Sequence, residues 1–395
     1  MAICTHVSGE TYIFNRLLYS GSQSTVQLVT NIQTYEVVVR KVSKYKPVVR
    51  NAHDVANVPE DNEVRILDHL NALRLNPVYL LTGLTPRWST CISHEKVVQS
   101  SGPESQTECL QVSYWKLCNA GSLSSFIDCW CSGSMADNME GMLFPVSVLA
   151  RCIAQVCETL HFMYQGRPRG RLSLRSAPGT TYLVHYDSYP GTDGLPDFYL
   201  GDFGWARTAS EEQADSQTTP GINWQGRARA PGAASAGERR RWDVTRFLSM
   251  LEPLMRWTVM PWKRRWSAEP PNVPLQSKQA MALQGLITML KYVDDQDETM
   301  AARNPTSRPP YLVEVVREAK RVEEFALQAE MGTESFEVVS KWGQLQLARS
   351  HQEKPHVFAS EEWATQPQLL DMGAAQAERY GKAYIEGPWT LVNSE

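Results

Sequence analysis

The amino-acid sequence predicts an α+β protein with two lobes, in which a small β-rich lobe precedes a larger helical lobe. Residues 11–45 alternate apolar and polar side chains between Gly and Asn turns, which is typical of strands. Residues 239–330 have mainly helical periodicity. The length of 395 residues fits two or three domains, or one large domain with two lobes.

The first part of the chain combines strands with one clear helix. Residues 61–74 change to helical spacing. The apolar residues that this spacing places on one face are Val64, Leu67, Leu70 and Leu73. A polar insert at 99–107 then precedes a strand-like run, CLQVSYWKLC. We expect the β-rich lobe to occupy residues 1–116.

The second part is expected to be mostly helical. Helices are predicted at 122–132 and 144–165, followed by irregular, strand-bearing sequence to about residue 206. A loop rich in Gly, Ala, Ser and Thr follows at 207–238, before the helical stretch of 239–330. The helical lobe is therefore expected at 117–332. A C-terminal extension, residues 333–395, has one stretch of helical spacing at 366–384.

Charge excludes one class of function. The chain has 39 Lys and Arg against 43 Asp and Glu, a formal net charge of −4. A general nucleic-acid binder would be basic, so we do not expect nucleic acid as a partner.

Cysteine usage and targeting patterns indicate the compartment. All eight Cys lie between Cys4 and Cys157, a lopsided distribution that is unusual for a disulfide framework. The first residues lack the pattern of a secretory signal, and no apolar run approaches the ~20 residues that span a bilayer. We expect reduced thiols in an intracellular protein, cytoplasmic or nuclear, that does not act at a membrane.

Seven short strings carry residues with possible chemistry, in a defined order. The sharpest is YLGDFG, a strand-like run that ends in Asp202-Phe203-Gly204. Taken singly, each string also fits an ordinary structural role, such as a hairpin Gly, a turn Asp or a surface ion pair. The other six strings contain, in order, Gly21 to Val26, Lys41 at the end of VVRK, Glu63 in NEVRIL, KLCNAGSL at 116–123, WDV at 242–244 and SRP at 307–309.

Together these strings, over residues 12–330, resemble the eukaryotic protein kinases. The resemblance implies that Lys41 contacts the α- and β-phosphates of a nucleotide and pairs with Glu63, and that Asp202 holds Mg²⁺. Gly21 resembles the middle Gly of the Gly-rich loop, and Val26 follows it. Leu117 and Cys118 fall in the connector between the lobes. ATP and Mg²⁺ are the cofactors implied if the nucleotide site is retained, and no cofactor is certain from the residues.

The expected catalytic loop departs from the family pattern. In the family, His-Arg-Asp supplies the base, and an Asn five residues after that Asp holds a second metal ion. Anchoring on Pro178-Gly179 puts Arg175 in the Asp position and Thr180 in the Asn position, whereas one deletion puts Ser176 in the Asp position. No Asp or Glu lies between Glu158 and Asp187, so no register restores the base.

This departure predicts a pseudokinase, a catalytically impaired kinase-like protein that acts as a protein-binding or regulatory scaffold. A positioned general base contributes about 10²–10⁴ in rate, and Arg175 would bring charge of the wrong sign. Ala230-Pro231-Gly232 also lacks the Glu of the family's Ala-Pro-Glu string. The alternative is an active atypical kinase that uses Asp202 with one metal ion. A small-molecule phosphotransferase would also need a catalytic-loop Asp.

Three large side chains are expected to narrow the adenine slot. In the alignment Val38 replaces a small Ala, Trp115 is the gatekeeper and Tyr182 lies beneath the ring. Packed interiors leave little spare volume for a purine beside such groups. We therefore expect these side chains to pack toward one another and ATP binding to be weak or absent.

Two further features suggest partner contacts. The basic residues Arg227, Arg229 and Arg239 to Arg241 precede Trp242, and such a run is most simply a solvated face. The C-terminal extension carries Trp342, Trp363 and Trp389, which the kinase core does not explain. It either wraps the core or docks on another protein, whose identity the sequence does not give.

Overall fold

The computed structural model describes thirteen segments of the chain. Its secondary structure mixes antiparallel strands with helices, which confirms the predicted presence of both α and β structure. The described segments are residues 3–5, 9–20, 24–49, 62–74, 85–101, 106–165, 172–173, 181–186, 194–201, 207–208, 236–259, 278–293 and 311–352.

The chain divides into two compact units. The first unit contains Met1–Arg65, Thr90–Leu117 and Ala348–Glu395, and the second contains Ile66–Ser89 and Cys118–Leu347. The domain boundaries expected at 116/117 and 332/333 stay predictions.

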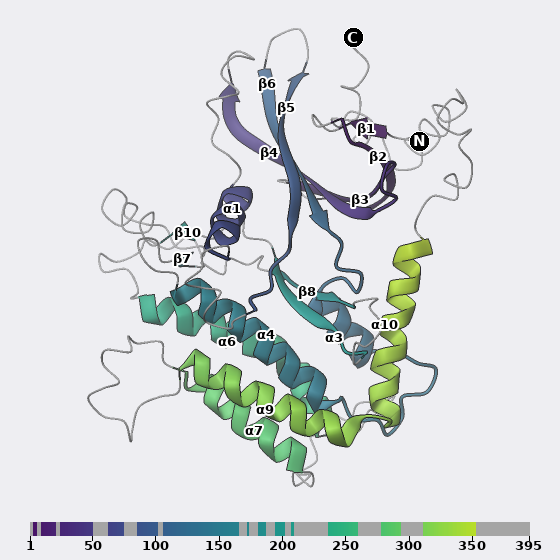
Figure 1. The fold of residues 1–395 in the computed structure, drawn as a ribbon, viewed down its shortest axis with the longest axis vertical. Helices are drawn as coiled ribbons and strands as arrows, with labels where there is room; N and C mark the ends of the chain where they lie inside the picture. The colour runs from purple at the N-terminus through teal and green to yellow at the C-terminus, as the bar shows by residue number, and fades with distance from the viewer. Residues whose placement is uncertain are drawn as a thin grey trace. The chain divides into compact units, whose positions relative to one another are not determined.

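The first unit is built on a six-stranded antiparallel sheet (Figure 1). Runs of β-branched residues, such as Val37 to Val39, favour this extended backbone. In spatial order the strands are β1 (Ile3–Thr5), β2 (Thr11–Ser20), β3 (Ser24–Asn31), β4 (Val37–Val49), β6 (Gln106–Lys116) and β5 (Cys91–Ser101).

One face of this sheet forms a hydrophobic core. Its buried members are Tyr12, Val29, Val38, Val42, Leu110, Val112 and Tyr114. Burying each Val or Leu side chain of this cluster stabilises the unit by about 1.5–3 kcal/mol. Arg40 lies on the same face, 2% exposed, and donates to Gln27 Oε1 at 2.9 Å. Its guanidinium also lies 6.0 Å from the centre of the Tyr114 ring, so its cost of burial is offset by both contacts.

The second unit is mainly helical. Figure 1 shows α4, α6, α7 and α9 side by side, in agreement with their contacts. Two short ladders accompany them, in which β7 (Leu172–Ser173) pairs with β10 (Arg207–Thr208) and β8 (Thr181–His185) with β9 (Asp197–Gly201). The helices of this unit are α3 (Leu123–Cys131), α4 (Val146–Gln165), α6 (Ala236–Trp257), α7 (Lys278–Lys291) and α9 (Leu312–Glu330). Two more, α1 (Asn62–Arg74) and α10 (Glu334–Gln352), have residues in both units.

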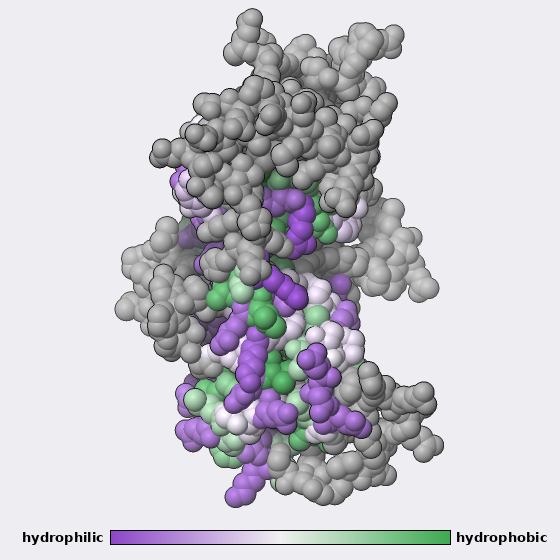
Figure 2. All heavy atoms as spheres, turned by 90° about the vertical axis from the view of Figure 1, so that its right-hand side faces the viewer, coloured by the Kyte–Doolittle hydropathy of each residue, from purple (hydrophilic) through white to green (hydrophobic). Residues whose placement is uncertain are grey.

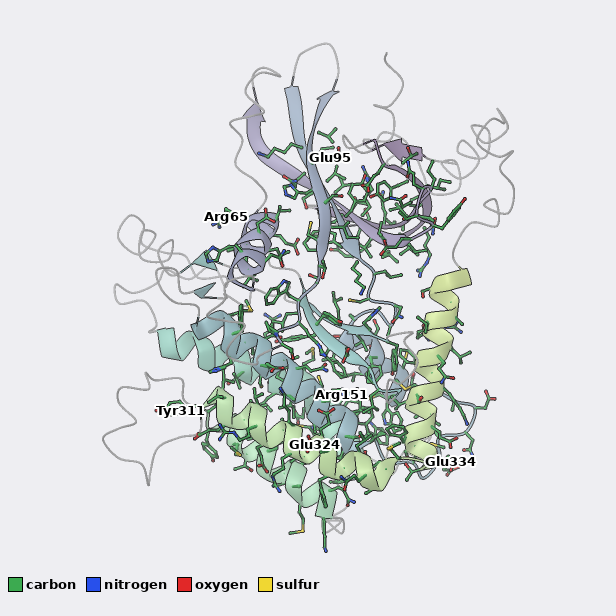
Figure 3. The ribbon with its side chains drawn as sticks, in the orientation of Figure 1. Arg65, Glu95, Arg151, Tyr311, Glu324 and Glu334 are labelled. Carbon is green, nitrogen blue, oxygen red and sulfur yellow. The ribbon has the colours of Figure 1, made fainter. Side chains whose placement is uncertain are left out.

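Helix α4 is the central helix of the second unit. Its segment Val146–Met163 is long and apolar enough to cross a membrane, but 94% of that segment is buried inside the protein. Arg151 of α4, labelled in Figure 3, pairs with Glu323 of α9 at 2.7 Å. At the start of α4, Glu330 accepts hydrogen bonds from the backbone of Val146 (2.8 Å) and Ser147 (3.0 Å). These bonds satisfy amides that a helix leaves unpaired at its N-terminus.

Three predicted helices agree with described ones, and the structure differs from the predictions at two other places. The helices expected at 61–74, 122–132 and 144–165 are confirmed as α1, α3 and α4. The two ends of the polar insert expected at 99–107 belong to strands instead: β5 extends to Ser101, and β6 begins at Gln106. These polar residues pair with one another across the two antiparallel strands. Helix α10 was not predicted. The stretch expected to be helical at 366–384 lies outside the described residues.

Candidate functional site

Lys41 and Glu63 form an ion pair in the first unit. Lys41 lies on β4, and its Nζ donates to Oε2 of Glu63, in the first turn of α1. The two side chains are 18% and 5% exposed. Removing either partner would leave a largely desolvated charge, which is costly. The contact predicted between these two residues is confirmed.

The residues beside Lys41 on its face of the sheet follow from the strand register. Val26 of β3 and Ser113 of β6 lie directly opposite Lys41, and Val39 lies opposite Trp115. Successive side chains in a strand point to opposite faces, so Lys41, Val39, Ser113 and Trp115 share one face. The structure thus brings together Val26, Lys41, Glu63 and Trp115, four of the predicted site residues.

Trp115 is held in place on the sheet face that carries Lys41. Its Nε1 donates to Ser113 Oγ at 2.8 Å, and Ser113 Oγ in turn donates to the backbone oxygen of Lys41 at 3.4 Å. The indole is 6% exposed. A large, hydrogen-bonded aromatic therefore occupies the sheet face two positions along β6 from the residue opposite Lys41.

Val38 lies on the opposite face from Lys41 and Trp115. It belongs to the core cluster with Tyr12, Val29 and Tyr114, and it is 2% exposed. The expectation that Val38 and Trp115 pack toward one another is therefore wrong, since the strand alternates faces at each residue. Val39, half-buried and directly opposite Trp115, is the β4 residue on the Lys41 face.

The connector residues Leu117 and Cys118 are both half-buried. Immediately before them, Lys116 N donates to Thr90 O at 2.9 Å in the first unit. After them, in the second unit, Gly121 N closes a turn onto Cys118 O at 3.0 Å. The connector thus has defined backbone bonding within each unit.

Tyr182 is packed inside the second unit. Its ring lies 5.3 Å from that of Phe247 in α6, and it is 5% exposed. Burial, with a smaller contribution from the carboxylate of Asp243, raises the pKa of the Tyr182 phenol. Leu183, on the other face of β8, is half-buried.

The remaining predicted site residues cannot be placed. Gly21, Arg175, Ser176 and Asp202 lie outside the residues that the structure describes. Within the described segments, no group of three or more His, Cys, Asp or Glu side chains could hold a metal ion.

A polar network that the sequence did not reveal holds β9, the strand that ends one residue before Asp202. Gln155 of α4 donates to Asp197 Oδ1 at 2.7 Å and accepts from Phe198 N at 2.8 Å. Along the strand, Ser89 N donates to Leu200 O at 2.7 Å, and Leu200 N donates to the backbone oxygen of Arg87 at 3.1 Å. The only sequence signal was a polar Gln on the apolar face of a helix.

Matches to known proteins are found among solved structures. No protein-family model matches the chain, and the curated proteins contain no match to it. Among the solved structures that match is one titled "Crystal structure of BubR1 kinase domain". It has 13% sequence identity and a TM-score of 0.46, and the match covers 86% of this chain and 87% of that chain.

Proposed function

We propose that the chain is a two-lobed, protein-kinase-like protein without phosphotransfer activity, which acts as a protein-binding or regulatory scaffold. The Lys41–Glu63 ion pair is the observation that carries this proposal. In kinases the same pair, between a strand Lys and a helix Glu, must be formed for the Lys to meet the nucleotide phosphates. An ion pair of this kind in a chain that lacks the catalytic base favours a kinase-like architecture with a role other than phosphate transfer.

Both registers of the expected catalytic loop lack a general base. Tyr182 was placed beneath the adenine by the register that puts Arg175 in the Asp position. Because its side chain packs on Phe247 in the interior, the half-buried Leu183 is the better residue for that role. Aligning Leu183 in place of Tyr182 shifts the alignment of the catalytic loop by one residue, which favours Ser176 for the Asp position. Neither a guanidinium nor a Ser hydroxyl is an adequate general base at neutral pH.

Weak nucleotide binding is the second part of the proposal. The bulk of Trp115, held by Ser113, lies on the Lys41 face, and Val39 stands where the family places a small Ala. To bind here, a purine would need to displace the packed side chain of Trp115. Its apparent affinity is then reduced in proportion to the fraction of molecules in which that side chain has moved away.

A thermal-shift series tests the nucleotide part. The native chain is measured with ATP alone, with ATP and Mg²⁺, and with ATP and Mn²⁺. We expect little or no rise in Tm, and a larger rise for Trp115→Met, because a ligand stabilises the folded state according to its affinity. Micromolar ATP binding by the native chain would contradict the proposed narrowing.

A transfer assay tests the catalytic part. We expect no transfer of the γ-phosphate to protein above that of Asp202→Ala. Reproducible transfer that is lost in Asp202→Ala would instead establish the alternative, an active kinase that uses Asp202 with one metal ion.

A further inference from the structure

The segment Cys118–Ser122, which we call the connector segment, is bonded to β8 within the second unit. Ala120 N donates to Val184 O at 3.1 Å, and Val184 N donates to Gly121 O at 2.8 Å. A further bridge pairs Ser122 with Leu183. The position of this segment's backbone therefore depends on the position of the end of β8.

Asn119 extends this bonding to the residue that follows β8. Its Nδ2 donates to Tyr186 O at 2.8 Å, and its Oδ1 accepts from Tyr186 N at 2.8 Å. One side chain thus satisfies both backbone groups of Tyr186. Rotation of Tyr186 would break both bonds together.

The side chain of Tyr186 is held by α10. Its hydroxyl donates to Val339 O at 3.2 Å, and its ring lies 6.1 Å from that of Trp342. Trp342 in turn packs on Phe126 of α3 at 5.5 Å. Tyr186 is 4% exposed, so its ring has no solvent into which it can turn.

Gly343 makes this contact possible. A Cβ added at Gly343 would lie 2.1 Å from Cε1 of Tyr186, far inside van der Waals contact. The ring therefore packs directly on the α10 backbone. At a second point, a Cβ added at Gly194 would lie 2.5 Å from Oγ of Ser340, so α10 approaches its neighbours closely at both places.

The outer side of α10 is mainly polar, although Leu345 is 55% exposed. Its exposed residues include Glu334 (labelled in Figure 3), Glu337, Lys341 and Gln344. Figure 2 shows hydrophilic side chains along the face of the second unit on which α10 lies. The apolar side of α10 is thus covered by this unit itself.

We propose that α10 positions the connector segment, with Tyr186 as the positioning residue. Helix α10 holds the Tyr186 ring, which fixes the backbone of Tyr186. The hydrogen bonds of Asn119 to that backbone then fix the connector segment. Displacing α10 would then change the backbone next to Leu117 and Cys118. This inference goes beyond the proposed function, because it holds whether or not a nucleotide binds.

The test compares two helical glycines in the full-length chain. Gly343→Ala forces a methyl against Tyr186, whereas Gly285→Ala in α7 meets nothing within 4 Å. Hydrogen exchange followed by mass spectrometry is measured on peptides covering 118–122, 181–186 and 278–291. We expect Gly343→Ala to speed exchange at least tenfold in the first two peptides and to leave the α7 peptide unchanged. Gly285→Ala should leave the first two peptides at the wild-type rate.

Two further variants separate positioning from a general loss of stability. Tyr186→Phe keeps the ring and removes only its bond to Val339, so it should fold and speed exchange in 118–122 by a few-fold. In a Tyr186→Ala background, Gly343→Ala should add no further change in that peptide, because the coupling residue is gone. The proposal is overturned if Gly343→Ala and Tyr186→Phe leave 118–122 unchanged, or if the α7 peptide changes equally.

Discussion

Gln155 in α4 and Asp197 at the start of β9 are joined by a hydrogen bond of 2.7 Å from Nε2 to Oδ1. The Oε1 of the same amide accepts from Phe198 N at 2.8 Å. One buried amide therefore satisfies a carboxylate and a backbone donor of the same strand. Since β9 ends at Gly201, this bond fixes the strand that precedes Asp202.

Gln155→Leu is expected to lower the free energy of unfolding by about 1–3 kcal/mol, because it leaves the buried Phe198 amide without its acceptor. The Asp197 carboxylate keeps Arg87 Nη1 at 3.5 Å. Urea unfolding followed by circular dichroism measures the change. The control is Gln284→Leu on the exposed side of α7, which should change stability by less than about 0.5 kcal/mol. Equal effects of the two substitutions would contradict the role of Gln155.

The Lys41–Glu63 pair is expected to behave as a unit. Lys41→Met alone should cost about 3–5 kcal/mol, because it leaves the Glu63 carboxylate desolvated and unpaired. The double variant Lys41→Met, Glu63→Gln should recover much of that loss. A double-mutant cycle in urea measures the coupling. Additive losses would show that the two charges do not depend on one another.

Val38 and Val39 are expected to affect different properties. Val38→Ala removes two methyl groups from the core cluster and should cost about 2 kcal/mol in unfolding free energy. In a Trp115→Met background, Val39→Ala should increase the rise in Tm given by ATP, whereas Val38→Ala should not. A larger ATP-induced rise in Tm for Val38→Ala than for Val39→Ala would contradict the assignment of these residues to opposite faces of β4.

The phenol of Tyr12 is expected to ionise at a higher pH than that of an exposed tyrosine. Burial, and next the acceptor carboxylate of Glu10, raise the pKa of the Tyr12 phenol to about 12. The folded protein therefore holds this proton more tightly than the unfolded chain. The stability that this provides is complete below pH 10 and is lost as the pH rises towards 12.

Absorbance at 295 nm measures the ionisation of Tyr12 as the difference between the native chain and Tyr12→Phe. No difference should develop between pH 9 and 11. A transition centred near pH 10 would show that the Tyr12 phenol is not buried as described.

Local patterns were sufficient for most single elements. The spacing of Val64, Leu67 and Leu70 indicated α1, and these three residues are buried in the structure. The pairing of Lys41 with Glu63 was also predicted, from the order of motifs along the chain. Such features follow from the sequence because they depend on periodicity or on a motif whose partners are strongly constrained.

Helix α10 shows a limit of local propensity. Its buried residues Phe336, Val339 and Trp342 recur at helical spacing, whereas Gly343 lowers the helix propensity of its interior. That same Gly is required by the ring of Tyr186, far away in the sequence. A residue that weakens a helix locally is here necessary for its packing, and only the tertiary contact reveals this.

By itself, the sequence determined the mixture of strands and helices, the ion pair of Lys41 and Glu63, and the lack of a carboxylate between Glu158 and Asp187. Only the tertiary structure decided which face each side chain occupies. A shift of one residue moves a side chain to the other face of a strand, as for Val38 against Val39. The register of pairing with neighbouring strands fixes that choice, and it depends on contacts between residues distant in the chain.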